Sequence, residues 1–557
     1  MKQYLIDEIK RDIIGNSTAY QTPFGLKNLF YADYTASGRG LNCIEDKIRN
    51  ILKSYANSHT EDDYTGKYMT DLLHQAEAKI KKLVNAGDNA KIISIGSGAT
   101  GALVKLQQIL GIYIPPVTKS RLYEIIARVR PEDTQLLQDI KNHHTVVFIS
   151  PYEHHSNELL WRESFSETVV VKMDSSGKLD LTDLDKQLSN RQYRNRPKIA
   201  SLSAGSNITG LKSQTYEIAA ICHQNNVPIL FDFAALAPYV DLNMNYNAES
   251  YFDAIFFSPH KFIGGPGSSG VLIFNDNLYR SDLPPTVAGG GTVDYVGYKF
   301  HDFSQDTETR EKAGTPAILQ TIKTALVMDL KDSIGIGNIL EAEENLSKIF
   351  FKQMQEEDNF EMIGNIPFKD RIPIISFNIK HHNKILHPKF VTKLLNDLFG
   401  IQSRAGCSCA GPYGHYLMGI DNEKSEMYRN LIAKGLSGLK PGWVRINLHY
   451  TFSVDDLNFL IAAIKFIAKY GYLFLKKYNF NMKTAEWQHE TYNKVEQLFS
   501  IEQDFKTQQV DISIIDDIRN GYLESALNQV KVLSTEKTTF KKDTAEIEAL
   551  KFFDYVK

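Results

Sequence analysis

Lys261 and Asp232 are the two residues whose types and positions best suit a shared chemical role. Asp232 follows the apolar run Pro228–Phe231, while Lys261 follows the run Ala254–Phe257 and precedes the glycine-rich turn Gly264–Gly267. Either residue alone has an ordinary explanation, as a helix cap or as a surface lysine. Together they suit pyridoxal phosphate (PLP), which needs a lysine amine for an imine and an anion beside its pyridine nitrogen.

Two further segments offer groups that such a cofactor would use. The loop Gly96–Gly101 precedes the helical pattern Ala102–Leu110, and a glycine- and hydroxyl-containing helix start can bind phosphate. The segment Glu153–Asn157 follows another apolar run and contains His154, an imidazole that could stack on a flat ring. A tight turn and a solvent-exposed histidine are the alternative explanations for these two segments.

Short apolar runs alternate with helical patterns such as Thr215–Asn225 through the first part of the chain. This alternation predicts an α/β domain with a largely parallel sheet, in which ligands bind beyond the carboxyl ends of the strands. The polar residues named above follow such ends. Residues 113–144 are predicted to form a helical insertion. The expected strands are Lys91–Ile95, Thr145–Ile149, Lys198–Ser203, Pro228–Phe231, Ala254–Phe257 and Gly270–Phe274.

The pattern changes near residue 334, which predicts a second, smaller α+β domain. We therefore expect an N-terminal helical segment over residues 1–30, a large domain over 31–334, a small domain over 335–478 and a helical C-terminal extension over 479–557. The elements expected in the small domain are the helices Asn338–Glu356, Pro388–Phe399 and Val454–Tyr472 and the strands Ile372–Ile379 and Trp443–His449.

Composition limits the classes of function. The 557 residues carry a net charge of −3, so no bulk attraction to nucleic acid or acidic lipid is expected. Four cysteines are too few for a disulfide framework. The start, Met1–Ile14, resembles an amphipathic helix rather than a signal peptide, and the apolar stretch Phe459–Phe474 is short for a membrane span and contains two lysines. We expect a soluble cytoplasmic protein.

The motifs taken together resemble the class V aminotransferase family. Within it, the chain is similar to cysteine desulfurases, selenocysteine lyases and the desulfurase domain of molybdenum cofactor sulfurases, over residues 28 to 475. The resemblance implies the PLP-dependent transferase fold of type I, with a mostly parallel seven-stranded sheet. The motifs are Tyr31–Gly38, Glu153–Asn157, Ser258–Lys261, Ala313–Pro316 and Arg404–Pro412.

The resemblance implies a role for each residue near the cofactor. Lys261 would form a Schiff base with PLP and later move the substrate's α-proton. Asp232 would pair with the pyridinium nitrogen, and His154 would stack on the ring and take part in acid–base steps. The phosphate would be bound by Gly98, Ala99, Thr100, Ser258 and His260.

The resemblance also implies residues for the substrate and for a second subunit. Asn207 would lie near the cofactor and the carboxylate of a small amino acid substrate. Arg445 would grip that carboxylate, with Arg404 as a second candidate, because a guanidinium fork matches two oxygens. Thr315 resembles a threonine that reaches the phosphate across a dimer interface, so a homodimer is expected.

The reaction itself depends on Cys409 and Ala235. Cys409 stands where some cysteine desulfurases carry their persulfide, so we expect it to accept sulfur from L-cysteine, release alanine and pass sulfur to an acceptor protein. Cys407 would resolve the persulfide or form a disulfide with it. Ala235 occupies a position where the family usually has a glutamine that bonds the cofactor's phenolic oxygen.

That departure keeps other hypotheses open. Cys407 and Cys409 could be half of a metal site, although no second Cys/His pair with zinc spacing is evident. They could also be inert in an aminotransferase, lyase or epimerase of the same family. A scaffold that kept the fold and lost activity is the hypothesis without catalysis, and intact Lys261, Asp232 and His154 argue against it.

Overall fold

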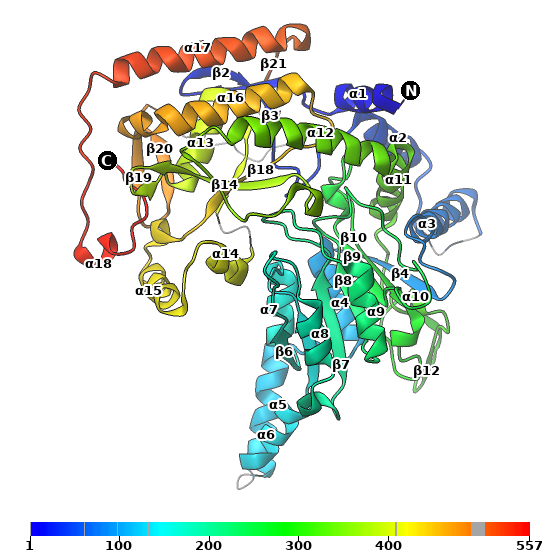
Figure 1. Ribbon diagram of the computed structural model, residues 1–557. Coiled ribbons are helices and arrows are strands. Elements are labelled where there is room, and N and C mark those ends of the chain that lie inside the picture. Colours follow the sequence, from blue (N-terminus) through cyan, green and yellow to red (C-terminus); the bar gives the residue numbers. More distant parts are fainter. Residues whose placement is uncertain are drawn as a thin grey trace. The chain divides into compact units, whose positions relative to one another are not determined.

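The computed structural model describes residues 2–58, 60, 62–96, 98–130, 134–406, 409–491 and 507–557. The chain divides into two compact units (Figure 1). The large unit comprises Ser37–Asn207 and Leu211–Gly337. The second unit comprises Met1–Ala36, Ile208–Gly210 and Asn338–Lys557.

A seven-stranded sheet forms the centre of the large unit, in the order β4-β10-β9-β8-β7-β5-β6. All neighbouring strands pair in parallel except β10, which is antiparallel to both of its neighbours. This confirms the predicted mostly parallel sheet. The strands are β4 (Ala90–Ile95), β5 (Thr145–Ile149), β6 (Ser166–Val170), β7 (Lys198–Ser203), β8 (Ile229–Asp232), β9 (Ala254–Phe257) and β10 (Gly270–Asn275).

The inner strands are mostly apolar and buried, as expected for a sheet that is covered on both faces. Leu103 and Leu106 of α4 pack in one core cluster with Val147, Leu230 and Phe256 of the sheet. Because β4, β5, β7, β8 and β9 run in the same direction, their carboxyl ends meet at one edge of the sheet. The helices are α2 (Asn42–Leu52), α3 (Tyr64–Leu83), α4 (Gly98–Ile109), α7 (His155–Glu163), α8 (Leu181–Leu188), α9 (Thr215–Gln224), α10 (Thr307–Arg310) and α11 (Ile318–Ile334).

Two segments of the large unit lie apart from its sheet. The helices α5 (Pro116–Val129) and α6 (Thr134–Asn142) occupy residues 113–144, where the sequence predicts a helical insertion, and Figure 1 shows them at one end of the unit. The hairpin β11 (Val293–Val296) and β12 (His301–Phe303) is largely exposed.

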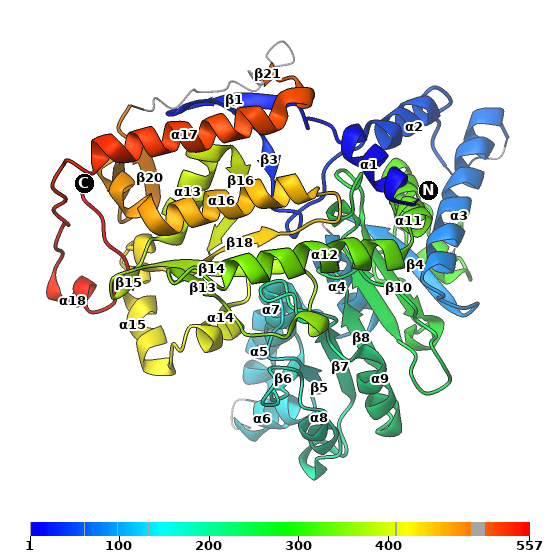
Figure 2. The ribbon, with the colours of Figure 1, turned by 45° about the horizontal axis from the view of Figure 1, so that its top comes forward.

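The second unit is built on a five-stranded sheet, with strand order β13-β14-β18-β17 and β15 paired to β14. Figures 1 and 2 show the long helices α16 and α17 side by side in this unit. The strands are β13 (Phe360–Met362), β14 (Ile374–His381), β15 (Lys384–Ile385), β17 (Arg404–Gly406) and β18 (Trp443–Asn447). The helices are α12 (Ile336–Met354), α13 (Pro388–Phe399), α14 (Gly411–Leu417), α15 (Asn422–Ala433), α16 (Val454–Tyr470), α17 (Ile515–Leu533) and α18 (Ala545–Glu548).

Both ends of the chain pack in this second unit. Phe30 shares a core cluster with Tyr522, Leu533 and Phe553, and the Tyr522 hydroxyl accepts a hydrogen bond from the Asn28 N–H at 2.9 Å. The N-terminal elements are α1 (Lys2–Asp12), β1 (Thr18–Thr22), β2 (Gly25–Asn28) and β3 (Phe30–Tyr31), and β3 pairs in parallel with β16 (Ile401–Gln402). This pairing groups residues 31–36 with the second unit rather than with the large domain.

The C-terminal extension, which we expected to be helical, begins with a β-hairpin. Strands β19 (Tyr478–Asn481) and β20 (Glu486–His489) pair antiparallel, and their alternate residues Tyr478, Phe480, Trp487 and His489 are buried. The short strand β21 (Gln508–Gln509) pairs with β1.

One stretch, Val454–Lys477, is long and apolar enough by composition to cross a membrane. Within the second unit, 67% of its most apolar window is buried. Its residues Leu460, Ile464 and Ile467 are at most 1% exposed in the core cluster, so packing within the fold uses this apolar surface.

Candidate active site

The edge where the parallel strands end contains a cavity of about 200 Å³, called here the Lys261 pocket. Every residue that lines it belongs to the large unit. The pocket brings together eight of the residues predicted from the sequence, and Ala235 also lines it. The eight are Ala99, Thr100, His154, Asn207, Asp232, Ser258, His260 and Lys261.

Asp232 and Lys261 reach the pocket from neighbouring strands. Asp232 is the last residue of β8, and Lys261 ends a short 3₁₀ turn, Pro259–Lys261, directly after β9. Burial raises the pKa of Asp232 to about 6, while a hydrogen bond of 2.8 Å from the Ala234 N–H and the nearby Lys261 amine act in the opposite direction. Asp232 is therefore mainly a carboxylate at neutral pH, next to an amine.

The start of α4 supplies an anion-binding end to the pocket. Gly98 has a φ of +63°, and a Cβ there would lie 2.7 Å from Ser258 Oγ, so a side chain would be both strained and in collision. Ser258 Oγ accepts the Ala99 N–H at 2.8 Å and can still donate its own hydrogen. Thr100 Oγ1 lies 2.7 Å from Ser156 Oγ. Hydroxyls at a helix N-terminus suit a phosphate group.

Two histidines, His154 and His260, also line the pocket. His154 precedes α7 as its cap, and its Nδ1 accepts the Ser156 N–H at 3.2 Å, so the neutral ring carries its hydrogen on Nε2. Burial lowers the pKa of His260 to about 4, with a further contribution from Lys261. His260 is therefore neutral at neutral pH and acts as a hydrogen-bonding group rather than as a cation.

A buried network of hydrogen bonds around Glu153, the residue before His154, was not predicted from the sequence. Glu153 Oε1 accepts from the N–H and hydroxyl of Ser150, at 3.0 and 2.6 Å, and from the Ser203 N–H at 2.8 Å. Its Oε2 accepts from Asn157 Nδ2 at 2.8 Å, and Asn157 Oδ1 accepts from Trp161 Nε1 at 2.9 Å. The i, i+4 spacing of Glu153 and Asn157 was the available signal. The network holds the ends of β5 and β7 against α7.

We expect Glu153→Gln to reduce stability most at low pH. Burial raises the pKa of Glu153 from 4.5 to about 8, so between these values the folded chain keeps a proton that the unfolded chain has lost. The stabilisation is complete below about 4.5 and declines as pH rises to about 8. Protonated Glu153 can donate to the Ser150 hydroxyl while its other oxygen accepts from Asn157 Nδ2. Glutamine must instead turn its NH₂ group toward the Asn157 amide or toward the Ser150 and Ser203 N–H groups, so urea unfolding at pH 5 should show a loss of about 1–3 kcal/mol.

The difference in the free energy of unfolding between wild type and Glu153→Gln should be smaller at pH 8.5 than at pH 5. Glu163→Gln, at an exposed carboxylate at the end of α7, is the matched control and should show no such change. If the stability difference between wild type and Glu153→Gln stays constant or grows as the pH rises, the raised pKa of Glu153 is contradicted.

Thr315 does not line the Lys261 pocket. Its Oγ1 accepts a hydrogen bond of 3.3 Å from Asn57 Nδ2, within the large unit. The expected role of Thr315 on a second subunit stays a prediction.

The two arginines predicted to bind substrate lie in the second unit, where both contact one carboxylate. Asp33 Oδ2 accepts from Arg404 Nε at 3.0 Å, and Asp33 Oδ1 accepts from an Arg445 amino group at 3.3 Å. Burial lowers the pKa of Arg445, while Asp33 opposes this shift. Asp33 belongs to the Tyr31–Gly38 motif, but its contact with these two arginines was not predicted from the sequence.

Cys409 stands in the turn between β17 and α14. It is exposed, it has a φ of +57°, and a thiolate at this position would raise the pKa of the Arg445 guanidinium. An exposed cysteine near a guanidinium suits a nucleophilic thiolate. Cys407, its expected partner in sulfur chemistry, lies outside the described residues.

Comparisons with known proteins identify the family of the chain. The family model "Aminotransferase class-V" matches residues 134–457. A probable cysteine desulfurase of Halalkalibacterium halodurans is 25% identical over 424 residues, covering 74% of this chain and 93% of the relative. A probable cysteine desulfurase of Streptomyces coelicolor is 25% identical over 389 residues, covering 69% and 84%.

Solved structures share the fold. The apo structure of a cysteine desulfurase from Thermococcus onnurineus has a TM-score of 0.64 at 22% identity and covers 83% of this chain and 98% of its own. The cysteine desulfurase CsdA of Escherichia coli has a TM-score of 0.58 at 18% identity, with coverage of 78% and 93%. The predicted fold type is thereby confirmed. Since the family match spans more than half of its residues, the chain belongs to the class V aminotransferase family.

Proposed function

We propose that the protein is a PLP-dependent enzyme of the cytoplasm that removes sulfur from L-cysteine, with Cys409 as the sulfur acceptor. One observation carries the PLP assignment: a single pocket joins an amine, a buried carboxylate, an imidazole and the hydroxyls of a helix N-terminus. These are the groups needed by the aldehyde, the pyridine nitrogen, the ring face and the phosphate of PLP. Membership of the family and similarity to cysteine desulfurases support the choice of reaction.

Five residues of the Lys261 pocket have a defined task in this proposal. PLP, when bound, supplies an electron sink for charge that develops on the α-carbon of the substrate. Lys261 would hold the cofactor covalently and carry the α-proton. Asp232 would keep the ring nitrogen protonated, and Ser258 and Thr100 would donate to the phosphate. His154 offers Nε2–H as a proton donor.

Sulfur transfer would be the work of Cys409. Its thiolate would attack the sulfur of L-cysteine, so that an S–S bond forms while the C–S bond breaks and its electron pair stays with the carbon. Protonation of that carbon gives alanine, and Cys409 carries the persulfide until a thiol reductant or an acceptor protein removes it. Arg445 and Arg404, which balance Asp33, would bind the substrate carboxylate.

We expect Cys409→Ala to lower sulfide release from L-cysteine by at least about tenfold, because no other residue is proposed to take the sulfur. Purified protein with PLP, L-cysteine and a reductant should be assayed for sulfide and alanine. Cys43→Ala is the matched control, since Cys43 is also exposed, and it should retain full activity.

The same assay separates the alternatives. If Cys409→Ala makes sulfide and alanine as fast as wild type, the persulfide role is wrong. If wild type makes no sulfide but other amino acids change the absorbance of bound PLP, the aminotransferase, lyase or epimerase hypothesis gains. Ala235 lines the pocket at a position where the family usually has glutamine, and this difference is the reason to test the alternative hypothesis.

A further inference from the structure

Asp33 places a carboxylate of the chain itself against the two arginines that are proposed to bind the substrate carboxylate. Arg404 and Arg445 are directly opposite each other on β17 and β18, where like charges repel. Asp33 offsets this repulsion, because its Oδ2 accepts from Arg404 Nε at 3.0 Å and its Oδ1 accepts from Arg445 Nη2 at 3.3 Å. These three side chains are called here the Asp33 cluster.

The backbone on both sides holds Asp33 at this position. The N–H of Ala32 donates to Gln402 O, and the Ala32 carbonyl accepts from the Asn447 N–H, both at 2.9 Å. Gln402 precedes one arginine of the cluster by two residues, and Asn447 follows the other by two residues. Ala32 thus connects the two chain segments that carry the arginines, and the next residue, Asp33, is placed to reach both side chains.

The three charges of the Asp33 cluster add up to a single positive charge. The side chains of Asp33 and Arg445 are only 6% and 5% exposed, so water screens their charges little, while that of Arg404 is 52% exposed. Burial lowers the pKa of Arg445, Asp33 raises it and Arg404 lowers it, but a guanidinium stays protonated in proteins. Two positive groups and one negative group leave one positive charge for a ligand.

We propose that Asp33 is a specificity-determining residue, which limits the arginine pair to ligands with one carboxylate. Asp33 offsets one guanidinium, and the α-carboxylate of the ligand offsets the other. A second anionic group on the ligand then meets no remaining positive charge, and the Asp33 carboxylate repels it. The inference rests on the proposed function, since it takes Arg404 and Arg445 as the binding site of the substrate carboxylate.

Calorimetric titration of the PLP-loaded protein with L-aspartate and L-asparagine tests this directly. The two probes have nearly the same size and differ by one carboxylate, which is an uncharged amide in L-asparagine. Their ratio of dissociation constants cancels any effect of a substitution on the shared α-carboxylate. The parent protein is Cys409→Ala, because a Cys409 thiolate would add a negative charge near Arg445. In this parent, L-asparagine should bind at least as tightly as L-aspartate.

Two further substitutions should move the ratio in opposite directions. Asp33→Asn raises the charge of the cluster by one and should shift the ratio about three- to tenfold toward L-aspartate. Arg404→Gln lowers the charge by one and should shift the ratio toward L-asparagine. Because the Arg404 side chain is half-exposed, its replacement keeps the test valid even if Asp33→Asn does not fold.

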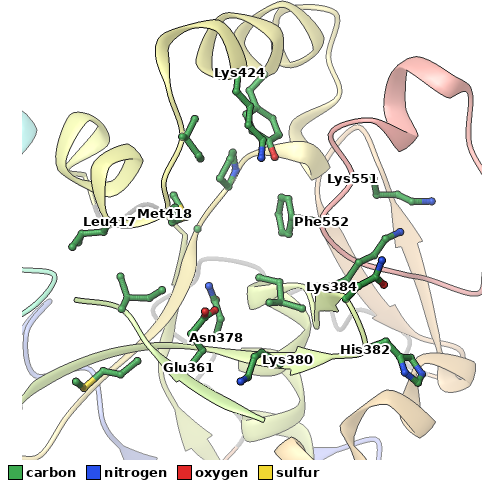
Figure 3. Close-up of a pocket in the computed structure, with 18 residues that line it drawn as sticks. Glu361, Asn378, Lys380, His382, Lys384, Leu417, Met418, Lys424, Lys551 and Phe552 are labelled. Atoms are coloured by element: carbon green, nitrogen blue, oxygen red, sulfur yellow. The ribbon is translucent and has the colours of Figure 1, made fainter. Parts of the chain in front are cut away.

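Glu361→Gln is the matched control, because it removes an exposed carboxylate from the same unit. Figure 3 shows Glu361 at a cavity of about 640 Å³ whose lining includes no residue of the Asp33 cluster. This control should leave the ratio unchanged. The inference is overturned if Asp33→Asn and Arg404→Gln leave the ratio unchanged, or if Glu361→Gln shifts it as much as they do. A parent protein that binds neither amino acid would instead contradict the arginine pair as the carboxylate site, and with it the proposed function.

Discussion

Replacement of Lys261 by alanine is expected to lower turnover by about a thousandfold or more, and to abolish covalent attachment of PLP. The physical reason is that the variant loses both the amine that forms the linkage and the group proposed to move the α-proton. Rates of alanine formation from L-cysteine and the absorbance of the PLP-loaded protein would measure the two losses separately.

Lys261→Arg is the matched variant for this prediction. It keeps a positive charge beside Asp232 but has no amine that forms an imine at neutral pH. If the role of Lys261 is covalent, arginine should be as inactive as alanine. Rescue by arginine would show that only the charge of Lys261 matters, and that the proposed attachment is wrong.

Asp232→Asn is expected to lower turnover by about a hundred- to a thousandfold while PLP still attaches to the protein. The asparagine oxygen can accept the Ala234 N–H as the carboxylate does, so the local fold should survive. The charge that keeps the pyridine nitrogen protonated is lost, and such preorganised charges carry much of an enzyme's transition-state stabilisation. Alanine formation and the PLP spectrum should be measured together.

If the Asp232→Asn variant no longer binds PLP, the role of Asp232 is to bind the cofactor rather than to keep its pyridine nitrogen protonated. Turnover within twofold of wild type would contradict its pairing with the ring nitrogen. Glu163→Asn, at an exposed carboxylate of the same unit, is the control for a general effect of lost charge.

Most of the central sheet could be predicted because buried parallel strands are continuous apolar runs. Thr145–Ile149, Lys198–Ser203 and Ala254–Phe257 were predicted at their observed bounds. The strand β6, Ser166–Val170, was missed because it lies at the edge of the sheet and is only partly buried, so its polar residues gave no apolar run. The β19–β20 hairpin was missed although its buried residues alternate with exposed ones.

The Lys261 pocket was predictable because its residues follow strands that must end at one edge. The hydrogen-bond partners of these polar groups could not be predicted from the sequence. Of the four hydrogen bonds to Glu153, those from Ser150 and Asn157 are local, but the one from Ser203 forms only once β5 and β7 pair. The contact of Asp33 with Arg404 and Arg445 likewise spans more than 370 residues of chain.

The central claim is that PLP is held covalently by Lys261, and trapping with borohydride tests it most directly. The purified protein would be loaded with PLP, reduced, digested and analysed by mass spectrometry for the modified peptide. We predict a single modified lysine, Lys261, in wild type, and no modified peptide when Lys261→Ala is treated in the same way. Modification of another lysine, or an unmodified Lys261 peptide in protein that binds PLP, would contradict the account.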